Sequence, residues 1–419
     1  MPRQFRASEF KRIAFRATGG RVKAIFWHLG VRSALEERGF RFITGIGERV
    51  EPGAGEIGIY VGSSAGSVFS MLVGAGFDVP DILESFLGRR SRMPAIQSST
   101  IFRRHRPTLG RYMQRIRNAI NLRAGEELFP GTGFGDGKIV GAADEPPIRA
   151  SYDLNLRKFA AHFHASDLLV VRAPYVLDDL EKWLRSLVAG HDRFEDLRAE
   201  NFFLASDLDD VGTTVFSARN EHHSWYRYLA GVPMSRAATA SMAIPSVFNP
   251  VPITVDGRKH YFIDGDVYNP TEPMIEHDSL CDLSIVSSFE APYRFHPAIG
   301  SLHHLGLPYE ISQTIALTIY SRFLQNRNSA RTKAHTFSVI RDILSKHLDE
   351  ETLEHECDRI AHALEIAADM KIVHVHPVKN PLLFFGNPFD LSPRGLAKMV
   401  VEAYLQASDL LEREGFHAT

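Results

Sequence analysis

Apolar residues along the chain form two patterns: short alternating or continuous runs, and longer stretches with a helical period. The short runs predict strands and the longer stretches predict helices, with glycines at 19–20 and at 39 between them. In the N-terminal part, strands are predicted at 12–18, 40–43 and 57–61, and helices at 24–38 and 67–73. This alternation of strand and helix favours an α/β fold with a mainly parallel central sheet.

The same two patterns continue to the end of the chain. Asp78, followed by Pro80 in a turn sequence, is a predicted N-cap of another short helix. Further strands are predicted at 202–207, 213–217, 281–287 and 371–376, and further helices at 176–189, 308–325, 334–347, 350–369 and 396–414. We therefore expect one large three-layer α/β/α domain, in which residues 10–290 form the core. Residues 291–419 are expected to form a mostly helical part with one strand, packed on the same domain.

The composition is typical of a globular protein, with 419 residues, 44% hydrophobic and 23% charged. A formal net charge of -2 disfavours a nucleic-acid-binding protein, which usually carries a clear basic excess. No run reaches the ~20 apolar residues of a membrane span, and no apolar signal-peptide core follows the basic start. We expect a cytoplasmic protein with two free thiols, Cys281 and Cys357, and export without a signal peptide stays an open alternative.

Ser64 stands at a predicted junction between a strand and a helix. The motif Gly62-Ser63-Ser64-Ala65-Gly66 follows one apolar run and precedes the helical stretch 67–73. A sharp turn at such a junction exposes a serine hydroxyl and directs the first N–H groups of the helix toward the attacked atom. Gly62 and Gly66 leave room for this turn. The sequence therefore predicts that Ser64 is a nucleophile.

A candidate carboxylate follows an aromatic strand later in the chain. Tyr261-Phe262-Ile263 precedes Asp264, and Gly265 after it permits a tight turn. A carboxylate at the end of a strand can reach a neighbouring loop. Asp264 is therefore a candidate site residue, and the alternative is an ordinary Asp-Gly turn.

Residues 88–125 contain many arginines and no acidic residue. One interpretation is a solvated surface whose arginines pair with carboxylates elsewhere in the fold. The other is a peripheral contact with an anionic membrane, because arginines beside apolar residues suit lipid head groups. The arginines assigned to this contact are Arg89, Arg90, Arg103, Arg104, Arg106 and Arg111.

From about residue 12 to Asn269-Pro270 the chain resembles the patatin-like phospholipase family. Gly62-Ser63-Ser64-Ala65-Gly66 matches the nucleophile elbow of the family, and the segment from Ser241 to Pro250 matches its Ser-x-Ala-x-Pro-x-x-Phe-x-Pro signature. Asp264-Gly265 stands at its Asp-Gly-Gly/Ala motif. The resemblance implies a patatin-like α/β/α fold. It also implies a dyad of Ser64 and Asp264, in which Asp264 is the base that deprotonates Ser64, and this dyad needs no cofactor and no metal.

Two positions depart from the family pattern. Where the family has Gly-Gly-Gly-x-Arg/Lys-Gly, this chain has Gly19-Gly20-Arg21-Val22-Lys23-Ala24. Main-chain donors do not depend on side chains, so an oxyanion hole is still expected. Its predicted donors are the N–H groups of Gly19, Gly20, Arg21 and Ala65. Asp266 replaces a small residue beside Asp264, and its side chain is expected to point to solvent or to cap a turn; the alternative is that both carboxylates face the site.

The resemblance implies a lipid acyl hydrolase of the phospholipase A or lysophospholipase type, with lipid as its partner and an acyl-Ser64 intermediate. One alternative is a lipid-binding protein without catalysis, because the loop at 19–24 is altered. Another is an α/β-hydrolase with a Ser-His-Asp triad, whose histidine would be His277, His296, His303 or His304. A zinc site is not predicted, since Arg359 stands where the zinc-protease helix needs its second histidine.

Overall fold

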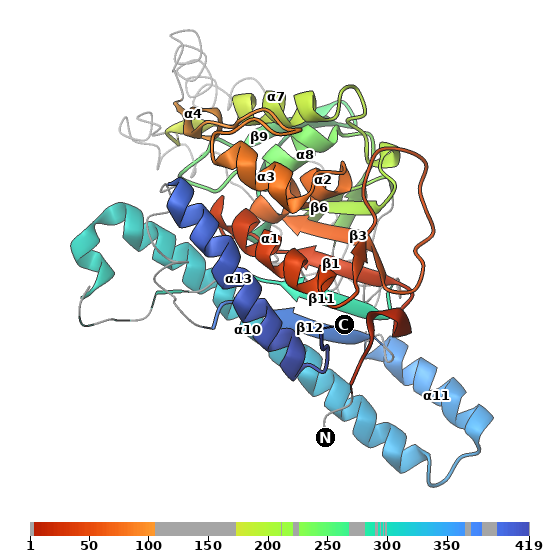
Figure 1. The fold of residues 1–419 in the computed structure, drawn as a ribbon. Helices are drawn as coiled ribbons and strands as arrows, with labels where there is room; N and C mark the ends of the chain where they lie inside the picture. Colours follow the sequence, from red (N-terminus) through yellow and green to blue (C-terminus); the bar gives the residue numbers. More distant parts are fainter. Residues whose placement is uncertain are drawn as a thin grey trace, which may run out of the picture.

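The structure is a computed structural model that describes residues 4–104, 173–210, 212–220, 226–267, 281–289, 300–364, 370–378 and 392–418, and a few residues between 289 and 300. It is a mixed α/β fold in which helices flank a mainly parallel sheet (Figure 1). The three-layer α/β/α arrangement predicted from the sequence is confirmed.

The sheet runs parallel from one edge to its centre and antiparallel beyond it. In spatial order its main strands are β12 (Lys371–Val375), β11 (Leu283–Ser287), β1 (Ile13–Ala17), β3 (Glu56–Ser63), β6 (Glu200–Asp207), β10 (Arg258–Asp264) and β9 (Val251–Val255). The first five are parallel to one another, whereas β10 is antiparallel to both of its neighbours. Three more strands pair at the sides: β2 (Arg41–Phe42) with β3, β7 (Thr213–Phe216) with β6, and β8 (Tyr226–Leu229) with β7.

The register of the central strands brings two strand ends to the same level. Ser63 of β3 pairs with Leu204 of β6, and Asp264 of β10 pairs with the next residue of β6, Ala205. Neighbouring strands lie about 4.8 Å apart, so the ends of β3 and β10 are separated by two such spacings. Ser64, which follows β3, and Asp264, which ends β10, therefore lie at the same level on the two sides of β6.

The helices, in chain order, are α1 (Lys23–Glu36), α2 (Ala65–Gly74), α3 (Val79–Phe86), α4 (Ser98–Ile101), α7 (Asp178–Leu187), α8 (Met234–Ser241), α10 (Leu307–Leu344), α11 (Glu350–Ala363) and α13 (Pro393–Arg413). A short antiparallel pair joins β4 (Arg103–Arg104) to β5 (Tyr175–Val176). Single 3-10 turns lie at Ala7–Glu9, Phe194–Asp196, Gly265–Val267 and Leu302–Leu305. Helix α11 turns back against the far end of α10, and the two extend beyond the sheet (Figure 1).

Successive residues of the central strands are buried on opposite faces of the sheet. In β1, Phe15 belongs to the large core beneath α1 and α2, while Ala14 belongs to a second cluster on the other face. In β6, Phe203 belongs to the large core and Phe202 to the second cluster. Burial on both faces explains why these strands appear in the sequence as continuous apolar runs.

The C-terminal part contributes to the same sheet and core. Strand β12 pairs with β11, and α13 packs along α1. The two helices approach closely at Gly30, where a Cβ would lie 2.5 Å from the Cβ of Ala403. The chain ends also meet, because the N–H of Phe5 donates to the carbonyl of Gly415 at 2.9 Å and the Phe5 ring stacks on Phe416.

Most element predictions are confirmed, with two differences. The segments 308–325 and 334–347 form one helix, α10, because the polar residues between them include neither glycine nor proline. Helix α8 and strands β8 and β9 were not predicted, since each is short and lacks a clear period. Asp78 does cap α3: its Oδ1 accepts the N–H of Asp81 at 2.7 Å. The two cysteines are buried free thiols, as predicted.

Candidate active site

Ser64 occupies a strained turn between β3 and α2. Its backbone has φ 53° and ψ -126°, a combination that non-glycine residues rarely adopt, and the residue is 2% exposed. Ala65 begins the helix immediately after it. The turn therefore has the geometry predicted for a nucleophile elbow, with Ser64 beside the N-terminal end of α2.

The two elbow glycines are required by close packing. A Cβ on Gly66 would overlap the carbonyl of Ala17 at the end of β1. A Cβ on Gly62 would lie 2.5 Å from the Cα of Ser67. Both substitutions would push α2 away from the sheet and displace Ser64.

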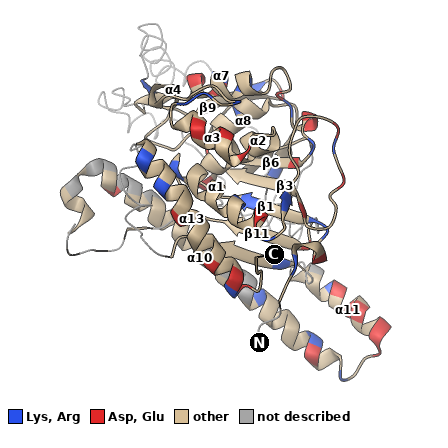
Figure 2. Ribbon diagram, in the orientation of Figure 1, with Lys and Arg blue, Asp and Glu red and all other residues tan. Residues whose placement is uncertain are grey.

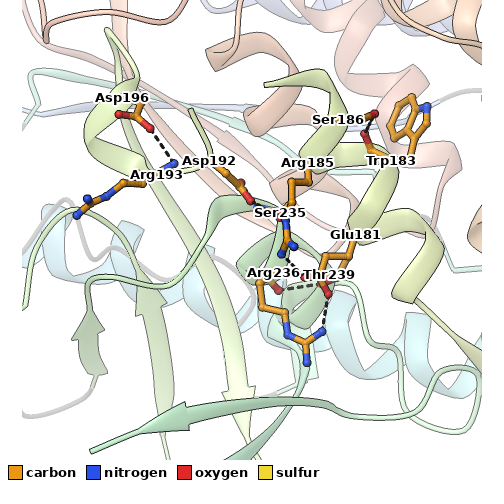
Figure 3. A network of polar contacts seen from close by, with 10 residues as sticks. All are labelled: Glu181, Trp183, Arg185, Ser186, Asp192, Arg193, Asp196, Ser235, Arg236 and Thr239. Atoms are coloured by element: carbon orange, nitrogen blue, oxygen red, sulfur yellow. Dashed lines mark hydrogen bonds and ion pairs between the residues drawn. The ribbon is translucent and has the colours of Figure 1, made fainter. Parts of the chain in front are cut away.

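A hydroxyl from α8 holds the backbone of Ser64. The Ser64 N–H donates to Ser241 Oγ at 2.8 Å, and Ser241 is the last residue of α8. Figure 3 shows how α8 is fixed from the other side: Arg236 forms an ion pair with Glu181 of α7, and Ser235 donates its hydroxyl to Asp192 at 2.5 Å. The ion pair and these hydrogen bonds connect α7 and α8 to the elbow.

Replacing Ser241 with alanine should destabilise the protein by ~1–3 kcal/mol, because the buried N–H of Ser64 loses its acceptor. The free energy of unfolding in urea measures this loss. Ser70→Ala is the matched control: Ser70 is equally buried on α2, and its hydroxyl makes no hydrogen bond with any described residue. Equal losses in the two variants would contradict the role assigned to Ser241.

Asp264 ends β10 close to the elbow and is 4% exposed. The residue after it packs directly against the strand that carries Ser64: a Cβ on Gly265 would lie 2.6 Å from Ser63 Oγ and would overlap the carbonyl of Leu204. The Asp264 carboxylate accepts the N–H of Asp266 at 3.0 Å through Oδ1. The structure therefore brings the predicted base and the predicted nucleophile to one place. The Ser64 hydroxyl makes no hydrogen bond with any described residue, and catalytic hydrogen bonds often form only with substrate present.

Asp266 corrects one prediction. Its side chain does not point to solvent: the residue is 1% exposed, in the 3-10 turn that follows β10. A Cβ on Gly19 would overlap Asp266 Oδ2 and would lie 2.6 Å from Ser64 Cβ. The Asp266 carboxylate thus packs beside Gly19 and Ser64, because the tight turn at Gly265 directs it inward.

The predicted oxyanion loop lies between β1 and α1. Gly20 has φ 138°, and a Cβ there would overlap the ring of Phe289, while Arg21 has φ 65°. The N–H groups of Gly19, Gly20 and Ala65 donate to no acceptor among the described residues. Two glycines suffice for the loop to approach Ser64, although the third glycine of the family pattern is absent.

His28 is a buried polar residue that the sequence did not single out as part of the site. It lies on α1 and is fully buried, with Nε2 2.8 Å from the carbonyl of Thr18 and Nδ1 2.7 Å from Ser287 Oγ. Burial lowers the pKa of His28 to about 4, although the Thr18 carbonyl opposes this shift. At neutral pH the imidazole is therefore uncharged.

The free energy of unfolding should decrease as the pH is lowered, because His28 binds a proton more readily in the unfolded chain than in the folded one. The unfolded chain has a histidine pKa of 6.5 and the folded chain a pKa of about 4, so the unfolded state binds more protons between these values. Because of His28, the free energy of unfolding should be about 2 kcal/mol lower at about pH 5 than at about pH 7.5. Urea unfolding of the wild type and of His28→Gln at both pH values measures it. Parallel losses in the two proteins would refute the lowered pKa.

Of the four histidines considered for a triad, the two in the described part of the chain do not lie in a suitable environment. His277 and His296 lie outside the described residues. The side chain of His303 is 80% exposed and binds Glu310, and His304 is also exposed. A triad histidine must instead contact the serine and a buried carboxylate.

Two of the arginines assigned to a membrane contact pair with acidic residues. Arg89 binds Glu84 at 3.2 Å and Arg103 binds Asp179 at 2.6 Å. Arg90 and Arg104 are exposed, whereas Arg106 and Arg111 lie outside the described residues. Figure 2 shows both signs of charge on this part of the fold and a concentration of acidic residues on α11. No helix in the described part of the chain is long and apolar enough to span a membrane.

One group among the described residues has the composition of a metal site. Asp207, Asp209 and His260 place their ligand atoms within 4.8 Å of one another. His260 already contacts Asp207 at 2.7 Å, which joins β10 to β6. Asp209 is exposed in the following turn. We interpret this group as a contact between strands.

Comparison with known proteins gives a family, and several solved structures also match the chain. A family model described as patatin-like phospholipase matches residues 18–275, more than half of the chain. No curated protein matches the chain. Among solved structures, VipD from Legionella pneumophila is similar, with 14% sequence identity and a TM-score of 0.35 over 96% of this chain and 67% of that one.

Proposed function

The chain belongs to the patatin-like phospholipase family, whose members are lipid acyl hydrolases, and from this premise we propose that it cleaves carboxylic esters of phospholipids or lysophospholipids through Ser64 and Asp264. The observation that carries the proposal is the register of β3, β6 and β10. In this register Ser63, which precedes the strained Ser64, pairs with Leu204, and the buried Asp264 pairs with the adjacent Ala205.

The proposed reaction begins when Ser64 Oγ attacks the ester carbonyl carbon. Asp264 takes the hydroxyl proton as the new C–O bond forms; a carboxylate is a weak base, so the two events must be concerted. Charge develops on the carbonyl oxygen, where the N–H groups of the loop at 19–21 and of Ala65 stabilise it.

The tetrahedral intermediate then collapses. The bond to the leaving alcohol breaks, Asp264 returns the proton to that oxygen, and an acyl-Ser64 ester remains. In the second half, Asp264 takes a proton from water as the water oxygen attacks the acyl carbon. Breaking the bond to Ser64 releases the fatty acid and returns the proton to Ser64 Oγ. No step requires a metal or an organic cofactor.

The proposed site of action is an anionic membrane surface in the cytoplasm. Arg90 and Arg104 support it, because both are exposed in the segment that contains no acidic residue. The pairing of Arg89 and Arg103 with carboxylates limits how much these two can add to binding. The salt dependence of binding to neutral and anionic vesicles measures this contact.

A covalent probe tests the proposed function. The wild type, Ser64→Ala and Ser70→Ala are incubated with a fluorophosphonate, and fatty acid release from phospholipid vesicles is followed in parallel. We expect an adduct on the Ser64 peptide in the wild type and Ser70→Ala, together with fatty acid release. Vesicle binding without an adduct or release would instead favour the non-catalytic lipid-binding alternative.

A further inference from the structure

A single peptide unit connects His28 to the predicted oxyanion loop. The carbonyl of Thr18 lies 2.8 Å from His28 Nε2, and the N–H at the other end of the same peptide belongs to Gly19. Gly19 in turn packs against Ser64 Cβ. The imidazole therefore contacts the carbonyl end of the peptide whose N–H end belongs to the site.

The contacts of His28 define its tautomer. A backbone carbonyl can only accept, so Nε2 must carry the proton that is donated to Thr18. The uncharged ring then has a lone pair at Nδ1, and the Ser287 hydroxyl at 2.7 Å donates to it. The Thr18 carbonyl thus selects the tautomer, and Ser287 satisfies the remaining ring nitrogen by donating to it.

A hydrogen bond to the Thr18 carbonyl has two effects on the Gly19 N–H. The peptide is planar and trans, so fixing the direction of the C=O fixes the opposite direction of the N–H. The bond also polarises the peptide, which makes the N–H a stronger donor. Both effects favour stabilisation of an oxyanion formed beside Ser64.

The surroundings of His28 keep this arrangement rigid. The Thr18 N–H donates to the carbonyl of Ser287 at 3.0 Å, and Thr18 Oγ1 accepts the N–H of Phe289 at 3.3 Å. The rings of Phe15 and Phe69 pack against the imidazole with centroids 6.4 and 5.2 Å away. The strand ends of β1 and β11 and the helix α1 are thereby joined around one ring.

We propose that His28 is a positioning residue of the hydrolase: through Thr18 it aims and polarises the Gly19 N–H, while Ser287 holds the ring by donating to Nδ1. The inference rests on the proposed function, in which Gly19 belongs to the oxyanion hole. His28 itself is assigned no contact with substrate and no proton transfer to it.

Two neutral amide variants separate positioning from packing. The amide nitrogen of glutamine in His28→Gln can occupy the place of Nε2 and still donate to Thr18, whereas the shorter side chain of His28→Asn reaches only the place of Nδ1. We expect kcat for a soluble ester to fall about 10- to 100-fold in His28→Asn with little change in KM, and less than tenfold in His28→Gln. His260→Asn controls for loss of a buried histidine elsewhere in the sheet and should keep kcat within about twofold.

Nitrogen-15 NMR of the histidines tests the inference without any turnover. We expect His28 to carry its proton on Nε2 in the wild type, and the Gly19 amide resonance to shift in His28→Asn more than in His28→Gln. Protonation on Nδ1, or equal kcat in the two amide variants, would overturn the inference. If the wild type hydrolyses no ester, the proposed function is wrong, and the NMR result still tests the positioning. In that case an unshifted Gly19 resonance in His28→Asn would show that His28 does not position the Gly19 N–H.

Discussion

Ser64→Ala is expected to lower kcat for ester hydrolysis by roughly 10⁴-fold or more, since the chain would lose the atom that forms the acyl intermediate. The fold should tolerate the change. Alanine has the same Cβ, leaves the Ser64 N–H bond to Ser241 in place and experiences the same strain at φ 53°. Substrate binding should therefore persist while turnover stops.

The measurement is fatty acid release from phospholipid vesicles and from a short soluble ester, with vesicle binding followed in parallel. Ser70→Ala, six residues further along and buried in α2, is the control and should retain wild-type rates. Residual turnover within tenfold of the wild type in a pure, folded Ser64→Ala sample would exclude Ser64 as the nucleophile.

Asp264→Asn should lower kcat by roughly 10³- to 10⁴-fold, because an amide cannot take the proton of Ser64. Asparagine is nearly isosteric and still offers an oxygen to the N–H of Asp266, which the carboxylate accepts at 3.0 Å. KM and the unfolding midpoint should change little. Removing an interaction that forms only in the transition state lowers kcat and leaves KM unchanged.

Asp266→Asn distinguishes the two buried carboxylates. Asp266 packs beside Gly19 and Ser64, so its replacement is expected to reduce kcat by about tenfold, well below the loss in Asp264→Asn. Asp209→Asn, in an exposed turn of the same sheet, should leave rates unchanged. If Asp266→Asn loses as much activity as Asp264→Asn, the assignment of one base is wrong, and the pair acts as a unit.

Local patterns predicted the elements that hold the site better than they predicted the contacts within it. The apolar run before Gly62 and the helical period after Ser64 were enough to place the elbow, because each element has a clear period of its own. The proximity of Asp264 to Ser64 depends on pairing across β6, whose residues are far away in the chain. From the sequence, only the family resemblance indicated that Asp264 and Ser64 belong to one site.

Asp266 and His28 show where sequence reasoning ends. An Asp-Gly-Asp segment usually forms an exposed turn, and nothing local indicates that this one directs a carboxylate toward Gly19. His28 lies within an apolar helix and has no motif of its own. Its importance comes from the ends of β1 and β11, which tertiary packing alone brings to the imidazole.

The packing of the chain ends has a consequence for biosynthesis. Helix α13 covers α1, and β12 pairs with β11 beside the strand that leads into the loop at 19–21. Until α13 has been synthesised, the face of α1 that it covers lacks this packing. We expect nascent chains to depend on chaperones until α13 has emerged from the ribosome. A product that stops near residue 275 should be degraded, and the hydrolysis that we propose should begin only after α13 has been made.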